Sequence, residues 1–364
     1  MKIAIVHDYI KEFGGAERVL EVLCEIYPDA PIYTAFYDKH STAYPHFKDK
    51  KIVSSWFNLL PFSSKLASPL RFLTPLIWGS FNFKDYDVVI SSASWYIAKG
   101  FGGRKPIEVC YCHTPPRWLY GYSTSVNFQK FAIVRVYALI VGHFLRLYDY
   151  KRAQKVNYFI ANSKEVKERI KKFYRRNSTV IYPPVSLPKT PKAKKEDYYF
   201  IVSRIVGAKG LDLAVKAAVK AGFKLKIAGS PPAGYSFEQQ KLLKNSKGKV
   251  EFLGQVSDKE LAKLYGQAKA FLALAKDEDF GITPVEAMLS GTPVIAFNGG
   301  GYKETVVNGR TGVLFDDYSA EGLVEVIKKF ESLKLNLKEC IEQAEKFNKE
   351  KFKAEIKDFI SKLT

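Results

Sequence analysis

Short apolar runs, which are typical of buried strands, alternate along this chain with stretches whose apolar residues recur every three to four positions, as they do in helices. The second half predicts strands at 199–203, 224–228, 250–253, 270–275 and 292–297, and helices at 211–221, 237–244, 259–268, 320–333 and 337–363. The first half predicts strands at 3–6, 86–91, 107–113 and 158–162, and helices at 16–26 and 165–173. Such alternation predicts an α/β protein with parallel, doubly wound sheets.

The division between two domains is visible in the composition of the chain. Residues 182–197 read YPPVSLPKTPKAKKED, a segment rich in proline and lysine without periodicity, as expected of a linker. A chain of 364 residues corresponds to about two domains. We therefore expect an N-terminal domain over 1–183 and a second domain over 184–345.

An acidic loop follows the strand predicted at 270–275. Asp277, Glu278 and Asp279 come directly after this strand, and Thr283-Pro284 is expected to begin the next helix. In open parallel sheets, ligands bind beyond the carboxyl ends of the strands. Unpaired amides at a helix start suit a phosphate, and the carboxylates of Glu278 and Glu286 can each accept hydrogen bonds from hydroxyls. The loop therefore suits a ligand with phosphates in its middle and a sugar at each end.

Simpler interpretations of the same residues stay open. Thr283-x-x-Glu286 is also a well-formed capping box, in which Glu286 would only close the helix N-terminus. Glu278 could likewise belong to an acidic loop that is merely solvated.

The run from Glu278 to Ala296, EDFGITPVEAMxxGTPVIA, resembles the signature of the family-4 retaining glycosyltransferases. That resemblance implies two Rossmann-like domains facing each other across a cleft, the glycosyltransferase-B architecture. It implies that Glu278 contacts the sugar of a nucleotide-sugar donor and acts in catalysis, and that Glu286 holds the ribose. Further donor contacts are implied for Phe280, Gly281, Ile282 and Thr283. Asp279 stands where the family usually has glycine, and this variant is similar to a mannosyltransferase-rich branch.

Two more candidates lie in the first half of the chain. Gly14-Gly15, between the first strand and the first helix, allows close approach of a phosphate, although tight turns use the same residues. The resemblance places this pair near the donor phosphates and the acceptor. His113 ends the strand predicted at 107–113 and would point into the cleft; a lone histidine is more often structural. The string from His113 to Arg117, HTPPR, resembles a histidine loop that contacts the donor sugar and phosphate, which makes His113 a catalytic candidate.

The second half adds a basic pair. Arg204 and Lys209 follow the strand at 199–203, where two cations could neutralise a diphosphate without a metal. In so basic a chain such a pair proves little by itself, but it is similar to the pyrophosphate-binding pair of the family. Val256 lies in a loop, 254–257, that resembles the one holding the nucleotide base through main-chain contacts.

The formal net charge is +20, which favours nucleic acid, an anionic membrane or a phosphorylated substrate as a partner. Residues 52–83 are rich in Trp, Phe and Leu, and residues 128–144 are also apolar and basic. Neither contains the uninterrupted apolar stretch of a transmembrane helix. Short helices on an anionic bilayer surface fit these segments; an irregular piece of core is the alternative. We expect no nucleic-acid partner, because no recognised nucleic-acid module is found.

Cysteine usage and the N-terminus favour a cytosolic protein. The four cysteines, at positions 24, 110, 112 and 340, lack the spacing of a zinc site. Residues 1–9 form a strand pattern rather than a secretory signal. No Asp-x-Asp-type metal motif is found, so we expect neither a metal nor a cofactor, with the nucleotide sugar as substrate.

These observations predict a retaining hexosyltransferase, with mannose from GDP-mannose as donor and a lipid-linked or glycolipid acceptor in surface polysaccharide or glycan assembly. The enzyme would be peripheral on the cytoplasmic face of the membrane. A UDP-sugar donor (glucose, galactose or N-acetylglucosamine) is the alternative; a nucleotide-sugar epimerase or a nucleic-acid-binding protein is less favoured. In the resembled fold the final helix crosses back, so residues 346–364 are expected to pack on the N-terminal domain.

Overall fold

The structure is a computed structural model that describes residues 1–123, 132–188, 193–231 and 236–363. The chain forms two compact units: residues 1–184 with 349–364, and residues 185–348. The chain therefore passes from one unit to the other at Pro184 and returns at Asn348. Each unit has its own parallel sheet and its own hydrophobic core.

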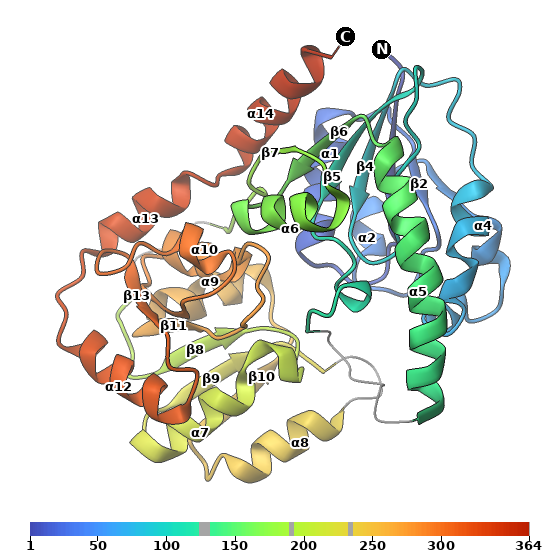
Figure 1. The fold of residues 1–364 in the computed structure, drawn as a ribbon. Coiled ribbons are helices and arrows are strands. Elements are labelled where there is room, and N and C mark those ends of the chain that lie inside the picture. Colours follow the sequence, from blue (N-terminus) through green and yellow to red (C-terminus); the bar gives the residue numbers. More distant parts are fainter. Residues whose placement is uncertain (124–131, 189–192, 232–235, 364) are drawn as a thin grey trace. The chain divides into compact units, whose positions relative to one another are not determined.

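The first unit is built on a seven-stranded parallel sheet with the strand order β3-β2-β1-β4-β5-β6-β7. Strands β2, β4, β5, β6 and β7 of this sheet are labelled in Figure 1. Its strands are β1 (Ile3–His7), β2 (Ile32–Thr34), β3 (Ile52–Ser54), β4 (Val88–Ala93), β5 (Ile107–Cys112), β6 (Tyr158–Ala161) and β7 (Ser178–Val180). Its helices are α1 (Gly15–Ile26), α2 (Tyr44–Phe47), α3 (Ser63–Leu66), α4 (Thr74–Gly79), α5 (Ala132–Lys155), α6 (Lys164–Tyr174) and α14 (Lys349–Ser361), with the short 3-10 helices η1 (Trp56–Leu59), η2 (Arg71–Leu73) and η3 (Arg117–Leu119). The strand order reverses between β1 and β4, which is where ligands bind in doubly wound sheets.

The second unit repeats this plan with six parallel strands in the order β10-β9-β8-β11-β12-β13. The strands are β8 (Tyr199–Val202), β9 (Leu225–Ala228), β10 (Val250–Gly254), β11 (Ala270–Ala273), β12 (Val294–Phe297) and β13 (Gly312–Phe315). The helices are η5 (Gly207–Lys209), α7 (Leu211–Ala221), α8 (Ser236–Asn245), α9 (Asp258–Gln267), α10 (Ile282–Leu289), α11 (Tyr302–Thr305), α12 (Ala320–Glu331) and α13 (Leu337–Glu345). Here the order reverses between β8 and β11. The predicted α/β class with two doubly wound sheets is confirmed.

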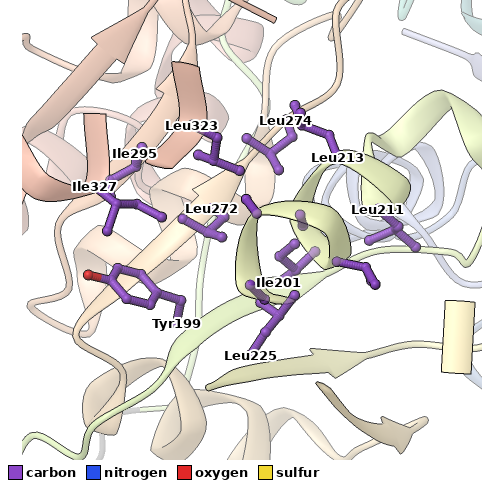
Figure 2. Close-up of a cluster of buried hydrophobic side chains, with 14 of the residues drawn as sticks. Tyr199, Ile201, Leu211, Leu213, Leu225, Leu272, Leu274, Ile295, Leu323 and Ile327 are labelled. Atoms are coloured by element: carbon purple, nitrogen blue, oxygen red, sulfur yellow. The ribbon is translucent and has the colours of Figure 1, made fainter. Parts of the chain in front are cut away.

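The core of the second unit shows why its strands are nearly all apolar. Side chains of α7 and α12 gather against those of β8, β11 and β12, among them Leu211, Leu272 and Ile295 (Figure 2). Helices cover both faces of such a sheet, so its central strands cannot alternate apolar with polar residues. The short runs that predicted these strands are the direct result.

The last part of the chain differs from the sequence prediction. The prediction of a single helix over 337–363 was wrong, because residues 346–348 are not helical and separate α13 from α14. The apolar face of α14 (Phe352, Ile356, Ile360) joins the cluster that contains Val19 and Leu23 of α1. Lys349 and Lys353 of α14 also pair with Glu25 of α1, at 2.6 and 3.0 Å. Helix α14 thus packs on the first unit.

The first of the two aromatic, basic segments contributes both to the core and to the surface. Phe57 and Trp78 are buried, whereas Leu59 is 85% exposed and Phe62 is 72% exposed. The segment predicted at 128–144 corresponds to the first half of α5, apart from residues 128–131, which lie outside the described residues. Across the described parts of the chain, no helix combines the length and the apolar character that crossing a membrane requires.

Candidate active site

The acidic loop between β11 and α10 is held by a glycine-rich loop that follows β12. The amide of Gly301 donates to the carbonyl oxygen of Glu278 at 2.9 Å. A Cβ on Gly300 would lie 2.2 Å from that same oxygen, and Gly300 has a φ of +52°. Only glycine fits so close an approach with this backbone. The sequence GGG at 299–301 therefore fixes the backbone position of Glu278.

The side chain of Glu278 meets Lys209 at the point where the strand order reverses. Lys209 is the last residue of η5, just beyond β8, and Glu278 follows the neighbouring strand β11. The Lys209 Nζ lies 2.7 Å from Glu278 Oε2, and both side chains are partly exposed. The hydroxyl of Tyr302 donates to the same oxygen at 3.4 Å. Burial of Tyr302, and to a smaller extent the nearby carboxylate of Glu278, raise the pKa of the Tyr302 hydroxyl well above its usual value. The hydroxyl therefore stays protonated and can donate.

Helix α10 begins differently from the sequence prediction. Its N-cap is Gly281, with a φ of +91° and no side-chain cap, so Thr283 lies inside the first turn and the capping-box interpretation is wrong. Glu286 is buried, and its Oε2 accepts a hydrogen bond from the hydroxyl of Tyr265 at 3.0 Å. The amides of Ile282 and Thr283 belong to the first turn of an eight-residue helix, where backbone N–H groups favour an anion. Phe280 is buried with its ring against Phe347, so its side chain is part of the core.

Arg204 and Val256 lie at the same edge of this sheet, beyond β8 and β10. The loops after β8, β9 and β10 are drawn together at Gly229, whose amide donates to the Gly254 carbonyl at 2.7 Å. A Cβ on Gly229 would lie 2.0 Å from the carbonyl oxygen of Ser203. The loop that contains Val256 leads into α9, which Ser257 caps by accepting from the Glu260 amide. The candidate residues of this unit therefore all follow carboxyl ends of its strands.

In the first unit, His113 belongs to a buried chain of hydrogen bonds. His113 Nε2 lies 2.8 Å from Ser92 Oγ, which lies 3.0 Å from Nδ1 of His7. The other ring nitrogen of His7 is 3.5 Å from a carboxylate oxygen of Glu17. Burial, and secondarily His7, lower the pKa of His113 to about 3, so its imidazole is neutral at pH 7. His7 at a strand end was visible in the sequence, but nothing there linked it to Ser92 or Glu17.

The two glycines near β1 lie at the start of α1. Gly14 is the N-cap of this helix, and its amide donates to a side-chain oxygen of Glu17 at 3.0 Å. Gly15 is the first helical residue. Glu17 therefore connects the Gly-Gly turn to His7, beside the reversal of strand order between β1 and β4. Among the described residues, no three His, Cys, Asp or Glu side chains are grouped as a metal site would need.

Comparisons with known proteins show what the chain is similar to. Residues 183–347 match the family model "Glycosyl transferases group 1". The uncharacterized glycosyltransferase MJ1178 of Methanocaldococcus jannaschii is 28% identical over 52% of this chain and 52% of its own length. The chain thus matches only about half of that first curated relative.

Several relatives are named as mannosyltransferases. The O-antigen chain mannosyltransferase RfbU of Salmonella typhimurium is 34% identical over 42% of this chain and 45% of its own. The alpha-1,3/1,6-mannosyltransferase ALG2 of Mus musculus is 26% identical over 96% of this chain and 94% of its own.

The solved structures show the fold of the chain as a whole. Anabaena Alr3699/HepE, in a crystal structure with UDP and glucose, superposes with a TM-score of 0.72 at 19% identity, over 99% of both chains. The fold is therefore that of the glycosyltransferase-B enzymes. Within it, residues 183–347 of this chain are similar to the glycosyl transferases of group 1.

Proposed function

We propose that the protein is a retaining hexosyltransferase that moves mannose from GDP-mannose to a lipid-linked or glycolipid acceptor in surface polysaccharide or glycan assembly. The observation that carries this proposal is the contact between Lys209 and Glu278 at the reversal of strand order, within the region that is similar to the glycosyl transferases of group 1. A cation for the diphosphate thus stands beside a carboxylate for sugar hydroxyls. The bond to be cleaved joins those two parts of the donor.

The chemistry would rest on electrostatic stabilisation by groups that are already in place. Lys209, Arg204 and the first amides of α10 would neutralise the negative charge that develops on the departing diphosphate, without a metal. Glu278 would orient the donor sugar, and Glu286, held by Tyr265, would bind the ribose. Val256 would contact the base through its main chain.

The configuration at the anomeric carbon would be retained if the acceptor hydroxyl attacks that carbon on the same face from which the phosphate leaves. The acceptor hydroxyl oxygen forms a bond to the anomeric carbon as the bond from that carbon to the phosphate oxygen breaks. The hydroxyl proton passes to the departing phosphate. His113 is neutral at pH 7, so it can hydrogen-bond to the donor without adding a positive charge. Gly14 and Gly15 would allow the donor phosphates to approach the start of α1.

Membrane binding is proposed for the exposed apolar side chains of the first unit. Those of the 56–79 segment and of α5 that are at least 48% exposed are Leu59, Phe62, Phe72, Leu76, Val136, Leu139, Ile140, Phe144 and Leu147. The two segments are joined by the Tyr137 hydroxyl, which donates to the Pro69 carbonyl at 2.5 Å. Exposed Lys65, Arg146 and Lys151 lie in the same segments. Each cation near an anionic leaflet contributes about 1 kcal/mol, so we propose a peripheral location on the cytoplasmic face.

A UDP-sugar is the second candidate donor, because the structural neighbour from Anabaena is described with UDP and glucose. The test is a panel of GDP-, UDP- and ADP-sugars in which binding is measured by calorimetry and hydrolysis by release of the sugar. Preferred binding and turnover of GDP-mannose supports the first proposal. Preference for a UDP-sugar would replace GDP-mannose as the proposed donor. If no sugar nucleotide is bound or turned over, the proposed transferase activity is rejected.

A further inference from the structure

The guanidinium of Arg71, in η2, lies over the rings of two tryptophans of the first unit. Its Cζ lies 4.4 Å from the ring centroid of Trp118 and 5.5 Å from that of Trp95. Both indoles are partly exposed. Trp95 lies in the loop after β4, and Trp118 lies in η3 after β5, so both follow carboxyl ends of strands, as His113 does. We call these three residues the Arg71 cluster.

The charge of Arg71 has no acidic partner among the residues that the structure describes. Its Nε is buried and makes no hydrogen bond there, and its Nη2 donates to the hydroxyl of Ser68 at 3.1 Å. Burial lowers the pKa of Arg71, yet an arginine remains charged at neutral pH. A partly buried cation without an anion is unfavourable. A planar guanidinium with unused N–H groups is suited to a phosphate.

The loop that presents Trp95 is held in place by its neighbours. The carboxylate of Asp8 accepts from the amides of Ser94 and Ala98, at 2.8 and 3.1 Å. The indole N–H of Trp118 donates to the Trp95 carbonyl at 3.2 Å. Ile97 has a φ of +61°, which is strained for a β-branched residue. Strain of this kind gathers at binding sites, where the surrounding structure enforces it.

The Arg71 cluster also adjoins the exposed apolar side chains. Phe72, which directly follows Arg71 in sequence, is 48% exposed, and Leu76, five positions after Arg71, is 63% exposed. The cluster therefore includes residues of strand-end loops and is followed in sequence by exposed apolar side chains. A phosphate that joins a sugar to a lipid chain has the same order of groups.

We propose that the Arg71 cluster is the subsite for the acceptor, and that it binds the phosphate or diphosphate linking the acceptor's sugar to its lipid. Arg71 receives the phosphate oxygens, the two indoles offer faces for the adjoining sugar or first lipid carbons, and Phe72 and Leu76 meet the chain. That the bound molecule is the acceptor of a sugar rests on the proposed function. The binding itself does not require transfer.

The test measures binding of geranyl diphosphate to the full chain by calorimetry and tryptophan fluorescence. GDP is present at a saturating concentration, so that geranyl diphosphate does not bind at Lys209. Arg71→Met is expected to weaken binding at least tenfold, and Arg71→Lys less. Arg104→Met, an exposed arginine in the loop before β5, should match the wild type. Geraniol tests the chain without phosphate, and pyrophosphate tests the phosphate without the chain.

Either of two results would overturn the inference. The first is that the wild type and Arg71→Met bind geranyl diphosphate with equal affinity, and the second is that geraniol binds as tightly as geranyl diphosphate. Co-sedimentation of the same variants with phosphatidylglycerol vesicles is measured in parallel. If Arg71→Met loses vesicle binding but keeps its affinity for geranyl diphosphate, Arg71 is a membrane contact instead. If Arg71→Met does not fold, Trp95→Phe and Trp118→Phe decide: the ligand-induced fluorescence change must shrink in at least one of them. No donor turnover is measured, and the readout is the difference between the wild type and Arg71→Met, so the result stays distinguishable from failure of the donor panel even if GDP does not bind.

Discussion

Lys209 and Glu278, 69 positions apart in sequence, form an ion pair at 2.7 Å where the strand order reverses between β8 and β11. Both side chains are partly exposed, so the pair contributes little to stability, about 0–1 kcal/mol. Its value would lie in binding. Lys209 can turn to a diphosphate while Glu278 accepts hydrogen bonds from the sugar attached to it.

Replacing Lys209 by alanine should weaken binding of GDP. One or two charged hydrogen bonds would be lost, each contributing about 1.5–3 kcal/mol, and Glu278 would be left facing the phosphates. Calorimetry with GDP gives the change, and Lys216→Ala serves as a matched control, because Lys216 is an exposed lysine paired with Asp212. Unchanged affinity in Lys209→Ala would remove Lys209 from the donor site.

Glu286→Gln should keep the fold and lose nucleotide affinity. The glutamine carbonyl can still accept the hydrogen bond from Tyr265, so the melting temperature should barely move. A neutral amide binds ribose hydroxyls more weakly than a carboxylate does, because charged hydrogen bonds are the stronger ones. Thermal melting and GDP calorimetry on the same samples separate the two effects. Full GDP affinity in this variant would reduce Glu286 to a partner of Tyr265.

His113 predicts a defined pH dependence of stability. Its pKa is about 3 in the folded protein and about 6.5 when unfolded, so between these values the unfolded chain binds a proton that the folded chain does not. The free energy of unfolding should therefore fall as the pH drops below about 6.5. Relative to His113→Gln, the wild type should lose about 2 kcal/mol between pH 7 and pH 5 in urea titrations. Parallel changes in both proteins would show that His113 is not buried as a neutral group.

Membrane binding should depend on exposed apolar residues and on salt. We expect Leu59→Ser, Phe62→Ser, Leu139→Ser and Ile140→Ser together to abolish co-sedimentation with anionic vesicles, and added salt to weaken that of the wild type. Phe57 is not used, because it is buried and its replacement would disturb the core. A control with Phe237→Ser and Leu243→Ser changes exposed apolar residues of the second unit. Equal pelleting of all three proteins would reject these side chains as the membrane contact.

The sequence predicted well what local patterns determine. Helix α7 has the predicted bounds, 211–221, because its apolar face is regular and Gly222 ends it with a left-handed backbone. The three-residue strands β2, β3 and β7 carry too little pattern to be recognised. Thr283 was a wrong N-cap because a left-handed Gly281 starts the helix instead. The hydrogen bonds from His7 to Ser92 and from Ser92 to His113 span 85 and 21 positions, so only the fold brings them together.

The most direct single measurement is the turnover of GDP-mannose by the wild type and Glu278→Ala, with GDP affinity determined on the same samples. Loss of one charged hydrogen bond to the donor sugar, about 1.5–3 kcal/mol, corresponds to a fall in turnover of about ten- to a hundredfold. Because Glu278 would contact the sugar and not the nucleotide, GDP affinity should change little. Undiminished turnover in Glu278→Ala, or a variant that loses GDP binding instead, would contradict the placement of the donor sugar at the Lys209–Glu278 pair.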